Sequence, residues 1–340
     1  MKYLQLIAGI TLLLAIFSTR LAGQEKDAIN VLFIGNSYTF RHDLPQLVKA
    51  IFEEGQPGLR VDATRIVYGG QDMFKHSNYY FTQSFLAQKT ITDKTLLERI
   101  KKMEGFLKIT NAPQEYADYY TRVARSRVPA FVDSHKHISR AIEMHRRLLE
   151  KNPRTRWDYV VLQSWRDVLP SLNTGYAKNV MEFVKIARTQ STKVILYFTA
   201  PDIQNSIPVK APLLQQRVNL EVALAAELAK EIEAYAVVPV PLAINMIQQN
   251  GTALKFCYKN DKHPNQYTAF LTANMFYAAF FKQSTAGFRF NTVTETHSKG
   301  QGKERDPDGG NATVVFDGAT KKYLQEIAFD AVSTFDKLLK

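Results

Sequence analysis

Short apolar runs recur along the chain and are separated by longer stretches of mixed polarity. Four runs have almost no polar position, and a fifth segment alternates and is rich in β-branched residues. They are Val31–Ile34, Tyr159–Leu162, Val194–Phe198, Ala236–Val238 and the alternating Leu59–Val67. Wholly apolar runs of this length are typical of strands that are buried on both faces of a parallel sheet.

The stretches between the runs predict helices. They are Leu44–Glu54, Ser134–Lys151, Leu213–Ala234, Gln266–Phe281 and Lys321–Leu339. Strands that alternate with helices imply a parallel sheet covered on both faces. We therefore expect an α/β protein, a three-layer α/β/α sandwich around a central, mostly parallel, five-stranded sheet.

One segment interrupts this alternation between the second and third strands. Residues 77–133 predict extra helices at Lys94–Leu107 and Gln114–Arg125, which we interpret as an insertion able to form a lid or cap over one sheet edge. Residues 27–340, including this insertion, are expected to form a single domain. The polar, Gly-rich stretch Thr296–Gly310 predicts a surface loop.

The N-terminal residues have the pattern of an export signal. Lys2 precedes the apolar stretch Tyr3–Phe17, and the small-residue exit Ser18–Gly23 follows. This order predicts a signal peptide over residues 1–23. Since no later segment reaches about 18 uninterrupted apolar residues, we expect an exported protein, periplasmic or secreted, with no stable membrane insertion after signal cleavage.

Composition and charge narrow the class of protein. The 340 residues are 45% hydrophobic and 22% charged, which is ordinary for a globular protein. The net charge of +12 comes from 44 Lys and Arg against 32 Asp and Glu, but no basic run is longer than two residues. We expect a solvated basic surface and no nucleic-acid partner. The single cysteine, Cys257, excludes a disulfide scaffold and is expected to be buried.

The first candidate for chemistry follows the first predicted strand. Residues 35–39 read Gly-Asn-Ser-Tyr-Thr, and ligands of open α/β sheets bind beyond the carboxyl ends of the strands. Ser37 would begin the next helix, where free N–H groups favour a nucleophile that develops an oxyanion. The alternative is a serine that only caps the helix.

A base for this serine is available near the other end of the chain. His263 lies in the loop Asn260–Pro264, directly before the aromatic helix, and can face the same sheet edge as Ser37. A serine hydroxyl is a weak nucleophile at neutral pH and needs a base such as imidazole within hydrogen-bond reach. A nearby carboxylate or amide would orient that imidazole.

Together these segments resemble the SGNH (GDSL-like) hydrolase family, in its exported bacterial subgroup with a Gly-Asn-Ser first block. Phe33–Thr39 looks like the first block, with Ser37 as nucleophile, and His263-Pro264 looks like the last block, with His263 as general base. The resemblance implies the flavodoxin-like SGNH type of sandwich. There is no Gly-x-Ser-x-Gly sequence, which argues against an α/β-hydrolase elbow.

The resemblance also implies an oxyanion hole. Tyr-Gly-Gly at positions 68–70 looks like the second block, whose glycine donates a backbone N–H. We assign that role to Gly70, with Gly69 as the alternative. Gln163 stands where the family has an asparagine side-chain donor, and the N–H of Ser37 completes the set.

One position departs from the family pattern. The family places an aspartate three residues before the histidine, but here that position is Asn260, and Asp261 is only two before. Three alternatives follow for the orientation of His263. Asn260 can accept through its amide oxygen, Asp261 can take over in a differently shaped loop, or a Ser–His dyad can use a backbone carbonyl.

Further residues near the blocks are candidate substrate contacts. They are Gly69, Tyr38, His76 and Trp165, with His42 a turn or so beyond the nucleophile. Packing in the core or at the rim is the alternative for each.

The expected function is that of an exported serine esterase with a Ser–His acyl-enzyme mechanism. Its substrate would be a small-molecule or glycan ester, such as an O-acyl or O-acetyl group on a carbohydrate. The alternatives are a lysophospholipase-like lipid acyl esterase and a non-catalytic carbohydrate-binding protein on the same fold. We expect no cofactor and no metal, since the sequence has no His-x-x-x-His motif and no Cys cluster.

Overall fold

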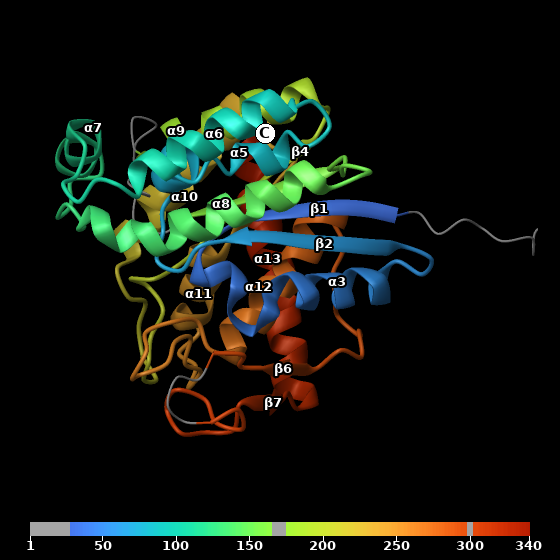
Figure 1. Ribbon diagram of the computed structural model, residues 1–340. Coiled ribbons are helices and arrows are strands. Elements are labelled where there is room, and N and C mark those ends of the chain that lie inside the picture. The colour runs from blue at the N-terminus through green and yellow to red at the C-terminus, as the bar shows by residue number, and fades with distance from the viewer. Residues whose placement is uncertain (1–27, 165–174, 298–301) are drawn as a thin grey trace, which may run out of the picture.

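The structure is a computed structural model that describes residues 28–164, 175–297 and 302–340 (Figure 1). The predicted signal peptide, residues 1–23, lies outside the described residues, and so does Trp165. No helix within these ranges is both long enough and apolar enough to cross a bilayer.

The described chain alternates strands and helices. The strands are β1 (Ala28–Gly35), β2 (Arg60–Val67), β3 (Tyr159–Ser164), β4 (Lys193–Phe198), β5 (Ala236–Pro239), β6 (Thr292–Thr294) and β7 (Thr313–Val315). The longer helices are α3 (Leu44–Gly55), α6 (Asp93–Phe106), α8 (His135–Glu150), α9 (Gly175–Thr189), α10 (Gln215–Ile232), α11 (Val240–Gln249), α12 (Gln266–Phe281) and α13 (Gly318–Leu339). The short ones are α2 (Ser37–Phe40), η1 (Arg41–Asp43), α4 (Met73–Asn78), α5 (Gln83–Leu86), α7 (Gln114–Asp118), η2 (Tyr119–Val123) and η3 (Phe131–Ser134).

The central sheet has five parallel strands in the order β2-β1-β3-β4-β5. This confirms the predicted α/β fold and gives the strand order of flavodoxin-like proteins. Gly35 pairs with Val67, and Ile34 pairs with Leu162, so β1, β2 and β3 end at the same sheet edge. Residues that follow these three strands are therefore brought close together.

The apolar runs face two different cores. Leu32 and Ile34 pack into one cluster, whereas Val31 and Phe33 pack into the other. This period of two is hidden in the sequence because both faces of the sheet are covered. Helices α6, α8 and α9 cover one face, and α3, α12 and α13 cover the other, so the molecule has three layers (Figure 1).

The extra helices of residues 77–133 belong to one of these layers. Helix α6 matches the first predicted helix to within one residue, and the second is divided into α7 and the π-helical turn η2. Tyr79, Tyr116 and Phe131 are fully buried and meet edge to face, with Tyr79–Phe131 ring centroids 5.3 Å apart. The segment thus contributes its own aromatic core to the layer on one face of the sheet.

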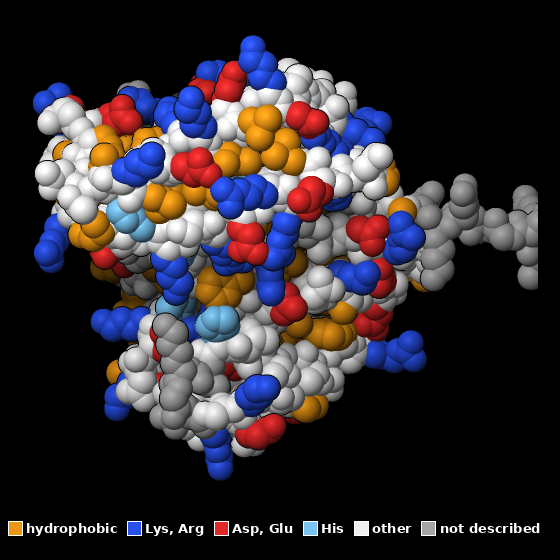
Figure 2. All heavy atoms as spheres, viewed as in Figure 1, with side chains coloured by type: hydrophobic (Ala, Val, Ile, Leu, Met, Phe, Trp, Pro, Cys, Tyr) orange, Lys and Arg blue, Asp and Glu red, His pale blue; other side chains and the backbone are white. Residues whose placement is uncertain are grey.

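The remaining predictions differ in detail. Helix α12 has the predicted bounds, whereas α9 and α11 were not predicted. Cys257 is buried, as expected. Figure 2 shows that basic and acidic side chains are interspersed over the face in view, which agrees with a spread of the basic residues over the surface.

A prediction tests the packing of α12 on the sheet. The Phe276 ring is fully buried, with ring centroids 5.8 Å from Phe33 and 5.4 Å from Tyr197. Replacing Phe276 by Ala should lower the free energy of unfolding in urea by about 3–5 kcal/mol, because it leaves a cavity. The control Val315→Ala, at a residue that is 65% exposed, should change it by less than about 0.5 kcal/mol. Equal stability of the two variants would contradict this packing.

Candidate active site

Ser37 lies directly beyond the carboxyl end of β1, at the first position of α2. Asn36 is the helix cap, because its Oδ1 accepts the Tyr38 N–H at 3.1 Å and its carbonyl oxygen accepts the Thr39 N–H at 3.0 Å. The alternative that Ser37 is itself the cap is therefore excluded. Its hydroxyl remains available for another partner.

That partner is His263. The Ser37 Oγ lies 3.0 Å from His263 Nε2, and His263 Nδ1 lies 2.6 Å from Asp261 Oδ1. An ionised carboxylate can only accept, so Nδ1–H is the donor and Nε2 is free to accept the Ser37 proton. The side chains of His263 and Asp261 are 29% and 28% exposed, so the chain of hydrogen bonds is reached from solvent.

Among the three alternatives for orienting His263, the geometry favours Asp261. Its carboxylate makes the short contact, and its backbone oxygen lies farther from Nδ1, at 3.2 Å. The side-chain Nδ2 of Asn260 donates to the Pro307 carbonyl oxygen at 3.5 Å, and the backbone N–H of Asn260 donates to the Asp308 carboxylate. Asn260 thus occupies the family's usual position without contacting the imidazole.

The ionised form of Asp261 is favoured by its neighbours. Burial favours the neutral acid, but hydrogen bonds from Arg41 and His263 outweigh burial and hold the pKa of Asp261 below its ordinary value. The Arg41 contact is 2.6 Å from Nη1 to Oδ2. The carboxylate can therefore stabilise positive charge on the ring.

A second Ser–His contact shows what distinguishes this one. His145 Nε2 lies 2.7 Å from Ser84 Oγ, which also accepts from Arg99 at 2.6 Å. Ser84 and His145 have no exposed surface, however. No substrate can reach that hydroxyl, so the Ser37 pair is the candidate for chemistry.

The predicted oxyanion loop adjoins the nucleophile turn. Asn36 Nδ2 donates to the Gln71 carbonyl at 2.9 Å, and Gln71 Nε2 donates to the Gly69 carbonyl at 3.0 Å. Gly70 has a φ of +68°, which suits glycine. Among residues 28–164, 175–297 and 302–340, the backbone N–H groups of Ser37 and Gly70 have no acceptor, which leaves both available to an oxyanion.

Gln163 lies beneath this turn and uses its oxygen. Its Oε1 accepts the Asn36 N–H and the Thr39 hydroxyl, each at 2.9 Å. A Cβ on Gly35 would lie 2.4 Å from that oxygen, so the close approach requires glycine. The Nε2 of Gln163 is buried without a partner in the described part of the chain. Gln163 thus braces the turn that carries Ser37 through its oxygen, and the expected N–H donation from Nε2 to the oxyanion stays a prediction.

The predicted substrate contacts have different outcomes. The Tyr38 ring lies 5.8 Å from the His263 ring, beside the site. Gly69 adjoins Phe40, whose ring would lie 3.7 Å from a Cβ there. His76 is fully buried and contacts the Gly35 carbonyl oxygen at 2.9 Å, so the expectation that it touches substrate is not met.

The sequence interpretation missed Arg41 and Glu295. Both are buried and paired, with Arg41 Nη2 at 2.6 Å from Glu295 Oε2. A single Arg and a single Glu have no spacing that distinguishes them from solvated surface charges. In the sequence, only the position of Arg41, two residues after Thr39, pointed to it.

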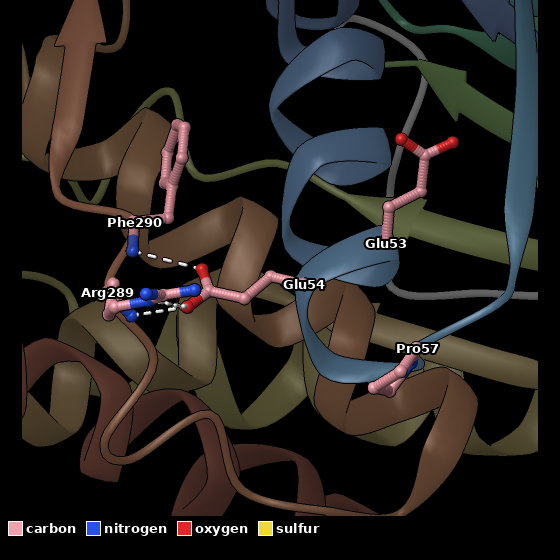
Figure 3. Close-up of a pocket in the computed structure, with 5 residues that line it drawn as sticks. All are labelled: Glu53, Glu54, Pro57, Arg289 and Phe290. Atoms are coloured by element: carbon pink, nitrogen blue, oxygen red, sulfur yellow. Dashed lines mark hydrogen bonds and ion pairs between the residues drawn. The ribbon is translucent and has the colours of Figure 1, made fainter.

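No other feature of the described residues competes for this role. They contain no group of three or more His, Cys, Asp or Glu side chains arranged to hold a metal ion. A pocket of about 610 Å³ lies near the other end of α3, where Glu54 points toward the N–H groups of Arg289 and Phe290 and Glu53 points away (Figure 3). The residues that line this pocket do not include Ser37, His263 or Asp261.

Comparisons with known proteins add little to this geometry. No protein-family model matches the sequence, and no curated protein matches it. Among solved structures, the chain is similar to a DUF4886 family protein from Bacteroides uniformis. The two are 12% identical, with a TM-score of 0.44, and the match covers 90% of this chain and 95% of that one.

The lowered pKa of Asp261 leads to a prediction about stability. A carboxyl whose pKa is lower in the folded state stabilises the fold above its unfolded pKa of about 3.9. That contribution is lost as the pH falls through the lower folded value. Asp261→Asn should therefore be less stable than wild type at pH 6, and the difference should shrink below pH 4. Urea unfolding at pH 6 and below pH 4 measures the difference in free energy of unfolding between the two proteins. A difference that is the same at both would contradict a lowered pKa of Asp261.

Proposed function

We propose that the protein is an SGNH-like serine esterase. One observation supports this above all others, namely the continuous hydrogen-bonded chain Ser37–His263–Asp261 at the carboxyl edge of the sheet, within reach of solvent. The backbone N–H groups of Ser37 and Gly70, which have no acceptor among residues 28–164, 175–297 and 302–340, support the second requirement of acyl transfer, a place for negative charge to develop.

The mechanism follows from the positions of the atoms. His263 Nε2 takes the Ser37 proton as Oγ attacks the ester carbonyl carbon. The N–H groups of Ser37 and Gly70 donate to the resulting oxyanion, and each such donor lowers the barrier by about 2.7–4 kcal/mol. His263 then protonates the leaving alcohol. In the second half of the reaction, His263 takes a proton from water as the water attacks the acyl carbon, and it then returns a proton to Ser37 Oγ as the acid is released. Asp261 remains ionised and holds the ring.

The proposed substrate is an O-acyl ester, such as an acetyl ester, of a carbohydrate or another small molecule. The basis is the predicted export, which would bring the protein to extracellular glycans. A lipid acyl ester is the other outcome of a substrate screen. The non-catalytic alternative was motivated by Asn260 in place of an aspartate, and the position of Asp261 on the imidazole removes that motive.

Turnover of acetyl and longer acyl esters tests the proposal directly. Ser37→Ala and His263→Ala should each lower kcat by about 10⁴-fold or more, since each removes a group that forms or breaks a bond. Asp261→Asn should lower kcat by about 10⁴-fold, because the ring loses its orienting carboxylate.

Asn260→Ala is the matched control in the same loop, and it should retain wild-type turnover. A fluorophosphonate should label Ser37 in the folded wild type and should not label Ser37→Ala. Failure of the folded wild type both to turn over any ester and to be labelled would refute the proposed function.

A further inference from the structure

Two consecutive residues, Arg41 and His42, contact the catalytic loop on both sides of His263. We propose that they form a two-point clamp that positions the imidazole, and that they are positioning residues for the reaction proposed above, on which this inference rests. Neither residue touches the Ser37 hydroxyl among the contacts of the described chain. Their effect would pass through Asp261 and Pro264.

The first point of the clamp holds Asp261. Arg41 Nη1 donates to Asp261 Oδ2 at 2.6 Å, whereas the other carboxylate oxygen accepts from His263. Each oxygen of the carboxylate thus has its own donor. A carboxylate bound at both oxygens cannot rotate, so the direction of its hydrogen bond to the imidazole is set.

The second point holds the backbone directly after the catalytic histidine. His42 Nε2 lies 2.8 Å from the Pro264 carbonyl oxygen. A carbonyl oxygen only accepts, so His42 donates through Nε2–H. Burial lowers the pKa of His42, so the ring carries this single proton at neutral pH. The loop is therefore held two residues before and one residue after His263.

The buried carboxylate of Glu295 contacts both clamp residues. Its carboxylate accepts from Arg41 Nε at 3.0 Å and from Arg41 Nη2 at 2.6 Å, and it lies 3.5 Å from His42 Nε2. It follows β6 directly in the chain and also accepts the His297 N–H at 2.6 Å. Arg41, His42 and Glu295 are all at most 4% exposed, so this is a built interior arrangement.

The backbone explains how neighbouring side chains reach the same loop. His42 and Asp43 have φ values of +55° and +51°, in the left-handed region that residues with a Cβ rarely adopt. This conformation lets the side chains of Arg41 and His42 both reach the loop Asp261–Pro264. Strained residues of this kind persist where the surroundings over-determine them, and they cluster at functional sites.

Stability alone does not account for the clamp. Burying ionised groups costs desolvation energy that their attraction often only offsets, and apolar side chains of similar size serve the fold as well. Placing an imidazole for proton transfer is more demanding, because a displacement of about 1 Å can lower the rate about 100-fold. We therefore assign Arg41 and His42 to positioning.

The test uses the whole protein and separates positioning from binding. Arg41→Met and His42→Phe remove the donors and keep most of the side-chain volume. Each should lower kcat about 100-fold and leave KM unchanged, because substrate contacts remain. The conservative variants Arg41→Lys and His42→Gln retain a donor and should recover part of the loss. Arg146→Met is the control, since it removes another arginine, one that pairs with Glu104 at the surface.

A proton NMR measurement reads the clamp without turnover. The Nδ1 proton of His263, shared with Asp261, should give a sharp low-field signal in wild type and in Arg146→Met. It should broaden in Arg41→Met and His42→Phe as the ring becomes mobile and the proton exchanges with water. In the Asp261→Asn background, Arg41→Met should cause no further loss of kcat, because the partner through which it acts is gone.

The outcomes distinguish this inference from the proposed function. Wild-type kcat and an unchanged Nδ1 signal in Arg41→Met and His42→Phe would overturn the clamp while the esterase assignment stands. If wild type neither turns over an ester nor is labelled by a fluorophosphonate, the proposed function fails, and the NMR signal still decides whether the clamp holds the ring. If a variant does not fold, its conservative partner is judged by the same two measurements.

Discussion

The hydrogen bond between Ser37 and His263 is the contact on which the rest of the site depends. It joins residues 226 positions apart, which only the folded chain brings together. β1 is an inner strand of that sheet, held between β2 and β3, so its carboxyl end is fixed from both sides. Two hydrogen bonds also hold the turn that carries Ser37. Gln163 accepts the backbone N–H of Asn36, and the Asn36 side chain donates to the Gln71 carbonyl oxygen.

Charge in this region is arranged in a line from surface to interior. Asp261 is partly exposed, Arg41 lies behind it, and Glu295 is innermost. Burial favours the neutral form of Glu295, but contacts from His42 and Arg41 outweigh it and hold its pKa below the ordinary value. The cation therefore lies between two carboxylates, and the negative charge on Asp261 is retained where the imidazole can use it.

The fold was largely predictable from the sequence because four of the five strands in the central sheet contain an unbroken apolar run. Helix α9 was missed, and α11 was missed because two prolines next to β5 indicated a break, whereas Pro241 lies in the first turn of that helix. In the site, Ser37 could be found because it follows a predicted strand, and His263 because it lies in a loop before a predicted helix and a serine nucleophile needs a base. The partner of the imidazole did not, since choosing between Asn260 and Asp261 requires the shape of a loop. His76 was a candidate substrate contact because the sequence does not show that its ring binds the Gly35 carbonyl oxygen inside the core.

The contact between Arg41 and Glu295 has a consequence for how the protein is made. It spans 254 positions, so Ser37 is synthesised long before Glu295, which holds Arg41 in place. An N-terminal fragment emerging from the ribosome carries the hydroxyl without the base or its support. The proposed site is therefore complete only when nearly all of the chain has been translated.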